Sequence, residues 1–298
     1  MPGDAFLHLS GAAGEEVRAF SEAEREHYFN LYGLDKPLTK QYLSYLTNLA
    51  QGDLGYSIYY NTTVSNIIMR RLPWTLFLVI SAVILQTGIA TILGVISAFY
   101  RDSWIDQLLY FKLILLSEIP DFILGLLILF VFAVIFALFP LAGGMSHFVT
   151  HNIQWDKIID ILHHAFLPIM TLTIAHLGGM YLLARNSVVG ILEKKYLVTA
   201  RAKGLSKIRI IFQHILRNAM LPIITRLFLS LGSLIGGAIL VENVFNYPGL
   251  GLLMREAVRL HDYPLIQGIF LVVAVLVLAA NLLADLIYKR IDPRIIEH

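Results

Sequence analysis

The sequence predicts an all-α protein that crosses a membrane several times. Of its 298 residues, 57% are hydrophobic and only 15% are charged, whereas an ordinary soluble domain carries about a quarter charged residues. Five segments are continuously apolar and reach the roughly 17 to 25 residues that a helix needs to cross a hydrocarbon core. Because apolar and polar residues do not alternate in them, helices fit these segments better than barrel strands do. A polytopic helical membrane protein is therefore the expected fold class.

The predicted spans are separated by charged or proline-containing stretches. In chain order they are residues 74–99, 122–139, 165–184, 219–241 and 264–284. A further apolar stretch, 105–117, is interrupted by Asp106 and Lys112 and leads to Pro120. Proline lacks a backbone donor and disfavours helix in the residue before it. We therefore expect a separate short helix and then a break before the span at 122–139.

The distribution of lysine and arginine predicts the orientation of the chain. Segments 100–121, 185–218 and 285–298 hold thirteen of these residues, and the opposite short loops hold three. By the positive-inside rule, the first set lies in the cytoplasm together with the C-terminus. The predicted divisions are an extracytoplasmic region (1–73), a transmembrane domain (74–288) with a cytoplasmic loop (185–218), and a cytoplasmic tail (289–298).

Residues 1–73 are polar, mixed in charge and not preceded by a signal peptide. Nothing visible in the sequence would carry them across a membrane. We therefore expect another apolar helix before Met1, which would give six spans and place both ends in the cytoplasm. An upstream coding sequence without an apolar run of about 20 residues would contradict this expectation.

Local rules predict the organisation of the cytoplasmic segment between the third and fourth spans. The stretch before Gly204 suits a short helix, Gly204 suits a turn, and Ser206 can cap a following helix. The small residues Ala200, Ala202 and Gly204 would let another backbone approach closely. The neighbouring basic residues suit an acidic partner surface or lipid headgroups. Charge alone favours a simpler interpretation, a positive-inside loop without any partner.

This segment also carries a sequence pattern. Its residues are Tyr196, Thr199, Ala200, Arg201, Ala202, Lys203, Gly204, Leu205, Arg217, Asn218 and Pro222. The pattern resembles the EAA loop of permease subunits in ATP-binding-cassette importers, in the form used by the dipeptide, oligopeptide and nickel branch. Val198 replaces the acidic residue that names the motif. Further stretches similar to that family are Pro2 to Asp4, Gly33 to Leu38, Gly52 to Gly55, Glu242 to Gly251, Asp262 to Pro264 and Asp292 to Arg294.

The resemblance implies a translocation subunit in a prokaryotic plasma membrane that carries dipeptides or oligopeptides inward. It implies four kinds of partner: the lipid bilayer, a second homologous permease, two cytoplasmic ATPases that bind ATP and Mg²⁺, and an extracytoplasmic solute-binding protein. Tyr196 and residues 199–205 would then couple the chain to the ATPases. The sequence has no Gly-x-x-x-x-Gly-Lys-Ser/Thr phosphate loop, so ATP hydrolysis is expected in the partners, and this chain is expected to bind no cofactor or metal.

Two alternatives remain open at this point. One is an importer of nickel or another small solute from the same family. The other, from a different class, is a secondary transporter or channel that works without an ATPase, which inverted hydropathy repeats or mid-membrane gate charges would support. A net charge of only +2 gives no indication of nucleic-acid binding.

Polar residues in or beside the spans are candidates for a transport pathway. Glu118 and Asp121 flank the Pro120 break, either as a gate-lining pair or as a solvated helix end. Arg226 lies inside the fourth span, where its long side chain can reach back to the interface or face a pore.

Other residues in the spans favour structural roles. Arg185 is expected to anchor the cytoplasmic end of the third span. His176 is expected to form an interhelical hydrogen bond rather than to bind a metal. Gly232 and Gly236 have a small-xxx-small spacing, which predicts close helix packing, with the partner permease as the expected neighbour.

Overall fold

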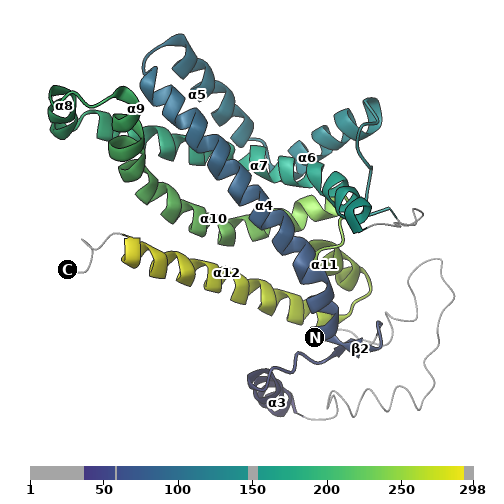
Figure 1. Ribbon diagram of the computed structural model, residues 1–298. Helices are drawn as coiled ribbons and strands as arrows, with labels where there is room; N and C mark the ends of the chain where they lie inside the picture. The colour runs from purple at the N-terminus through teal and green to yellow at the C-terminus, as the bar shows by residue number, and fades with distance from the viewer. Residues whose placement is uncertain (1–36, 58, 147–153, 292–298) are drawn as a thin grey trace. The chain divides into compact units, whose positions relative to one another are not determined.

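The computed structural model describes residues 37–57, 59–146 and 154–291, and within them the chain is almost entirely helical (Figure 1). Its helices are α3 (Leu38–Ala50), α4 (Val64–Phe99), α5 (Trp104–Ser117), α6 (Asp121–Leu129), α7 (Gln154–Leu192), α8 (Lys195–Ala202), α9 (Lys207–Arg209), α10 (Arg217–Val244), α11 (Leu250–Arg259) and α12 (Tyr263–Ile291), with the π-helical segments η1 (Phe130–Ile135) and η2 (Ile210–Leu216). Strands β1 (Tyr56–Ser57) and β2 (Thr62–Thr63) form one antiparallel hairpin. The predicted all-α fold class is confirmed.

Four helices of the described residues are long and apolar enough to cross a membrane. They are Val64–Phe99, Gln154–Leu192, Ile210–Val244 and Tyr263–Ile287, and a bent pair of shorter helices makes a fifth if it is counted as one span. Several helices start well before the predicted apolar segments, as α4 does at Val64 rather than at residue 74. Hydropathy marks only the lipid-facing part of a helix, whereas the backbone hydrogen bonds continue into its polar end.

The bent pair confirms the predicted break at Pro120. Helix α5 ends at Ser117, Pro120 is the N-cap of α6 with φ −54° and ψ 138°, and the two parts meet at 99°. The second part ends at Ile135, short of the predicted end at residue 139. Ala137 has a φ of +49°, which a right-handed helix cannot contain.

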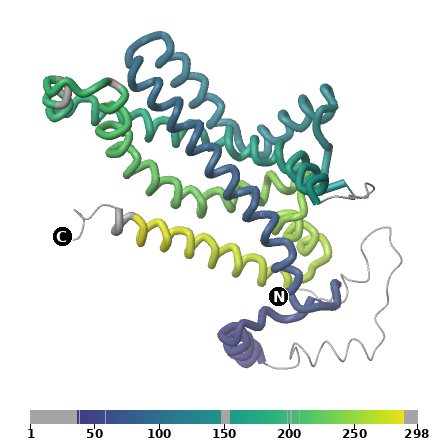
Figure 2. The backbone as a smooth tube through the Cα atoms, viewed as in Figure 1, coloured from purple at the N-terminus to yellow at the C-terminus, as the bar shows by residue number. Residues whose placement is uncertain are grey.

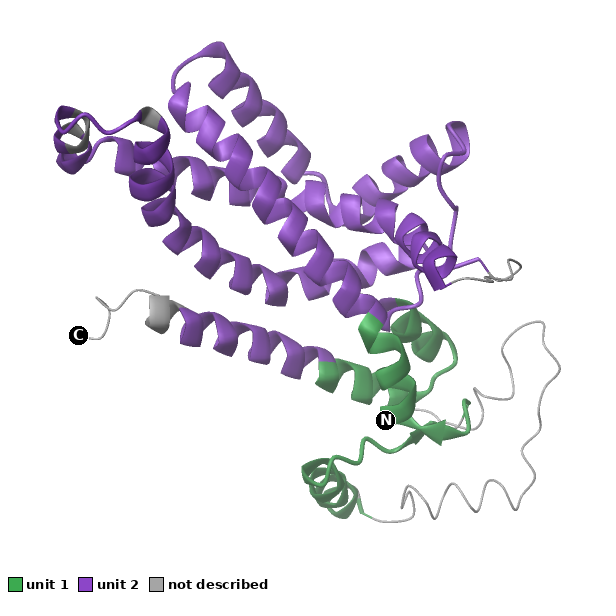
Figure 3. Cartoon of the chain, viewed as in Figure 1, with its two compact units in different colours: residues 1–73, 252–272 green, residues 74–251, 273–298 purple. Residues whose placement is uncertain are grey.

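Contacts divide the chain into two units (Figure 3). Unit 1 consists of residues 1–73 and 252–272, and unit 2 of residues 74–251 and 273–298. In unit 1, the hydroxyl of Ser57 donates to the buried carboxylate of Asp262, which also accepts from the amide of Leu265 at 3.3 Å. Burial raises the pKa of Asp262 above its ordinary value. These two hydrogen bonds join the β1–β2 hairpin to Asp262 and cap the first turn of α12.

Four expectations fall outside the described residues. They are the helix before Met1, the stretch Pro2 to Asp4, most of the stretch from Gly33 to Leu38, and the stretch Asp292 to Arg294. The predicted division at residues 73, 185, 218 and 288 into extracytoplasmic, transmembrane and cytoplasmic parts stays a prediction.

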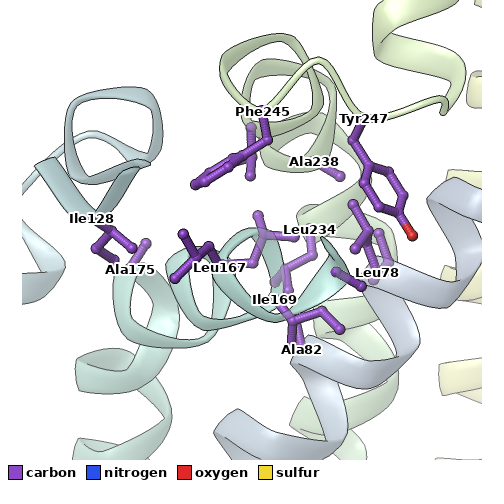
Figure 4. Packing of buried hydrophobic residues seen from close by; sticks show 14 of the residues in the cluster. Leu78, Ala82, Ile128, Leu167, Ile169, Ala175, Leu234, Ala238, Phe245 and Tyr247 are labelled. Atoms are coloured by element: carbon purple, nitrogen blue, oxygen red, sulfur yellow. The ribbon is translucent and has the colours of Figure 1, made fainter. Parts of the chain in front are cut away.

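The main apolar core of unit 2 lies where its long helices meet. Helix α10 packs against α7 and α6, and α5 packs against α7 (Figure 2). The buried side chains at this meeting point include Leu78, Ala82, Ile128, Leu167, Ile169, Ala175, Leu234, Ala238, Phe245 and Tyr247 (Figure 4). Burying so much apolar surface within one chain gives unit 2 a packed interior of its own, even though lipid would cover its outer faces.

Close helix approach depends on small residues at two places in unit 2. A Cβ added to Gly94 of α4 would lie 2.8 Å from both the Cβ of Ala184 and the amide of Arg185 on α7. At Gly232 an added Cβ would lie 3.1 Å from the side-chain oxygen of Asn281. The predicted close packing at Gly232 is therefore confirmed, but it is made with α12 of the same chain. An added Cβ at Gly236 would meet nothing within 4 Å.

Candidate functional site

The predicted cytoplasmic loop folds as a helix, a turn and a second helical segment. Helix α8 ends at Ala202, and Gly204 adopts a φ of +75°, a left-handed conformation that glycine adopts without steric cost. The hydroxyl of Ser206 then accepts from the amide of Arg209 at 3.4 Å, which caps the start of α9. The predicted turn at Gly204 and the predicted cap at Ser206 are both confirmed.

One face of this loop is open. The side chains of Thr199, Ala202 and Lys203 are exposed, as is Gly204, and a Cβ added to Gly204 would meet nothing within 4 Å. Leu205 is half-buried, and the side chains of Ala200 and Arg201 lie outside the described part of the chain. A surface of small and positively charged residues can accept a close backbone contact from an acidic partner.

Tyr196 and Leu197 fix α8 to the rest of unit 2. The side-chain amide of Asn218 donates to the hydroxyl oxygen of Tyr196 at 3.2 Å and to the carbonyl of His214 at 2.8 Å. Leu197 is only 1% exposed and packs in a small apolar cluster. Sequence reasoning missed Leu197, although a leucine in a helix of mostly polar and small residues was a usable signal for a buried contact.

An ion pair joins α5 to α7 inside unit 2. Arg185 donates from Nε to Asp106 Oδ1 at 2.7 Å and from Nη2 to Asp106 Oδ2 at 2.5 Å. The hydroxyl of Ser97 on α4 also donates to Asp106, and the hydroxyl oxygens of Ser97 and Tyr181 lie 2.6 Å apart. Two parallel bonds to one carboxylate make this a strong, geometrically specific pair. The carboxylate that Arg185 binds lies far away in sequence, and the expected anchoring of the cytoplasmic end of the third span by Arg185 stays a prediction.

The three predicted pathway residues have different surroundings. Asp121, the first residue of α6, lies with its Oδ2 3.2 Å from Nε2 of His176 on α7 and against the backbone of Gly237 on α10. The predicted interhelical bond of His176 is therefore confirmed. Glu118 is exposed at the end of α5, and Arg226 is exposed on α10. Whether these side chains line a pathway stays a prediction.

A second buried carboxylate, that of Glu242, lies near the C-terminal end of α10. Glu242 is fully buried, accepts from the hydroxyl of Thr75 at 2.6 Å and accepts from the amide of Gly251 at 2.5 Å. Thr75 in turn accepts from the amide of Leu250 at 2.8 Å. These bonds satisfy the amides at the start of α11, so the stretch from Glu242 to Gly251 works as a structural clasp.

Comparisons with known proteins agree with this architecture. Residues 90–297 match the family model described as binding-protein-dependent transport system inner membrane component. The chain is 41% identical to the oligopeptide transport system permease protein AppB of Bacillus subtilis (strain 168), over 97% of this chain and 92% of that protein. It is 33% identical to the dipeptide transport system permease protein DppB of Escherichia coli (strain K12), over 99% and 90% of the two chains.

A solved structure shares the fold. A chain from inward facing conformations of the MetNI methionine ABC transporter matches with a TM-score of 0.62, over 76% of this chain and 96% of that chain. Only 15% of the aligned residues are identical. The likeness therefore concerns the arrangement of helices and not the residues of a site.

Proposed function

The chain belongs to the family of binding-protein-dependent transport system inner membrane components, and we propose that it carries small peptides inward as one membrane-spanning subunit of an ATP-driven importer. The observation that carries this proposal is the match of nearly the whole chain to permeases named for oligopeptides and dipeptides. These names favour peptides over nickel as the substrate.

We propose the partners on chemical grounds. The open face of the α8–α9 loop is small and basic, which suits an acidic groove on a cytoplasmic ATPase. ATP and Mg²⁺ would be bound by two such ATPases, and a second homologous permease would complete the transmembrane pathway. A solute-binding protein would deliver peptide on the opposite side. The C-terminus would lie on the same side as the loop, in the cytoplasm.

Asp121 is the proposed pathway residue with the most support. A carboxylate within a membrane-spanning bundle is costly unless it is paired or faces water, and Asp121 is both paired with His176 and partly exposed. Glu118 lies just before the same break in the helix, and Arg226 offers a positive charge on α10. Such charges suit a pathway for peptides, whose termini are themselves charged.

The coupling of transport to ATP follows from linkage. Import requires two arrangements of the helices that differ in their affinity for the nucleotide-bound ATPases, because a partner shifts an equilibrium only by its differential affinity. In this proposal, closure and opening of the ATPases move the loop, and the loop moves the helices that flank it.

The test is peptide uptake by the complete complex in proteoliposomes, with the binding protein present. Uptake of a labelled dipeptide should require hydrolysable ATP and should stop with a non-hydrolysable analogue. Unimpaired uptake with the analogue would instead support a secondary transporter or channel. Competition by unlabelled dipeptides, longer peptides and Ni²⁺ identifies the substrate class. If only Ni²⁺ competes, the substrate is nickel and the proposed transport of peptides is wrong.

A further inference from the structure

One described side chain of helix α8 is buried against the rest of unit 2. Among the α8 residues whose side chains the structure describes, Lys195, Tyr196, Thr199 and Ala202 are exposed, and only Leu197 is buried. Among these described side chains, Leu197 makes the buried apolar contact and Tyr196 makes the polar one. A force applied to the open face of α8 can therefore reach the rest of unit 2 through the apolar cluster around Leu197, which forms its seat.

That seat is formed mostly by the segment that follows the loop. Leu197 belongs to a cluster with Ile210 and Ile215 of η2, Ala219 of α10, Ala98 of α4 and Val188 of α7. The polar bonds of Tyr196 run to the same place, because Asn218 and the carbonyl of His214 lie at the junction of η2 and α10. The ion pair between Arg101 and Glu193, with an N to O distance of 2.7 Å, also lies in this region, and both of its side chains are exposed. Exposed ion pairs contribute little to stability.

Segment η2 is a π-helix of seven residues that continues directly into α10. π-helical turns are rare, and they occur frequently at functional sites. The wider π-helical turn changes the local register of the helix. Because η2 and α10 form one continuous helix, a small shift of η2 relative to α8 would also move α10. The position of α8 and α9 beside the start of α10 can be followed in Figure 1.

We propose that Leu197 is the positioning residue through which the loop drives η2 and, through η2, α10. The inference rests on the proposed ATP-driven import. Because Leu197 is buried, its role in this proposal is to transmit displacement of α8. The open residues around Gly204 would receive the ATPase, whereas Leu197 faces inward and acts after docking.

The experiment measures peptide imported per ATP hydrolysed by the complete reconstituted complex. Leu197→Ala should leave ATPase co-purification and ATP hydrolysis in place, and should lower the peptide to ATP ratio by about tenfold, a size typical of coupling between two sites. Leu197→Met, which keeps the volume, should restore the ratio. Ile215→Ala, which empties the seat from the side of η2, should reproduce the loss.

Leu172→Ala is the matched control. Leu172 is fully buried on α7 in the main core of unit 2, outside the cluster of Leu197, so the same truncation leaves a cavity and lowers thermal stability without emptying the seat of Leu197. This variant should keep the wild-type ratio. Equal uncoupling in Leu172→Ala, or normal coupling in Leu197→Ala, would overturn the proposal.

Two further outcomes are decided by the same set of proteins. If Leu197→Ala does not assemble, Ile215→Ala provides the test, because this variant leaves α8 unchanged. Normal coupling in Ile215→Ala then overturns the proposal. If the wild-type complex shows no ATP-dependent uptake, the proposed function fails first, and this result is distinct from any difference among the variants.

Discussion

Asp106 and Arg185 bring opposite charges together inside unit 2, with side chains only 6% and 17% exposed. Removing one partner leaves the other buried and unpaired. Arg185→Met should therefore lower the free energy of unfolding by about 3 to 5 kcal/mol, as broken buried pairs do. The double variant Asp106→Leu/Arg185→Met should recover most of that loss, because an apolar pair needs no compensating charge. Thermal unfolding of the detergent-solubilised complex measures both effects.

The exposed pair of Arg101 and Glu193 supplies the control for this cycle. Arg101→Gln should change stability by at most about 1 kcal/mol, because both side chains are largely in solvent. A cost for Arg185→Met as small as that for Arg101→Gln would contradict the buried position of the Asp106 to Arg185 pair.

Sequence reasoning at the residue scale succeeded where the cause is local. Gly204 and Ser206 were predictable because a turn and a cap depend on a few neighbouring residues. The inward turn of Arg185 was not, because its partner Asp106 lies on another helix and no local rule connects them. The burial of Leu197 was not predicted, because the residues that bury it on η2 and α10 follow the loop and the local pattern shows mainly small and basic residues.

At the scale of elements, the break between α5 and α6 was predictable, whereas its angle and the π-helical segments were not. Pro120 removes a donor and restricts its neighbour, which fixes where the helix must end. The bend of 99° depends on how the two parts pack against other helices. A π-helix closes wider, i→i+5 turns than an α-helix, but η1 and η2 are too short and too apolar for this difference in spacing to show in the sequence.

The turn between α8 and α9 leads to a graded prediction at Gly204. Its φ of +75° makes any other residue strained, at about 1 to 2 kcal/mol for an ordinary side chain and less for asparagine. No atom lies near an added Cβ, so Gly204→Asn and Gly204→Ala should be tolerated in that order. Gly204→Glu adds negative charge to a basic face and should weaken ATPase docking and uptake most.

The amount of ATPase that co-purifies with each variant, together with ATP-driven uptake, checks this order. Gly204→Gln matches the size of glutamate without its charge and separates the two causes. If Gly204→Glu behaves like Gly204→Ala, strain in the turn is the only contribution of this position, and the open face does not receive an acidic partner.

At the scale of the whole molecule, composition and hydropathy were enough to predict the membrane-spanning class and its apolar segments, because lipid imposes a length and an apolar surface on every span. The ends of the helices were not predictable from hydropathy, since α7 begins at Gln154, well before its apolar part at residue 165. Many different sequences satisfy the length and apolar surface that lipid imposes. The chain accordingly shares its fold with the methionine transporter chain at only 15% identity.

Orientation is the last prediction, and the absence of cysteine from the sequence makes it easy to test. Exposed positions can be changed one at a time to cysteine and treated with a membrane-impermeant maleimide in intact cells. Gln51→Cys and Lys157→Cys should be labelled from outside, whereas Arg101→Cys and Lys203→Cys should be labelled only after permeabilisation. Labelling of Lys203→Cys in intact cells would place the loop outside and remove its proposed contact with a cytoplasmic ATPase. Protection of Gln51→Cys alone would leave the loop inside but would contradict the extracytoplasmic position of residues 1–73.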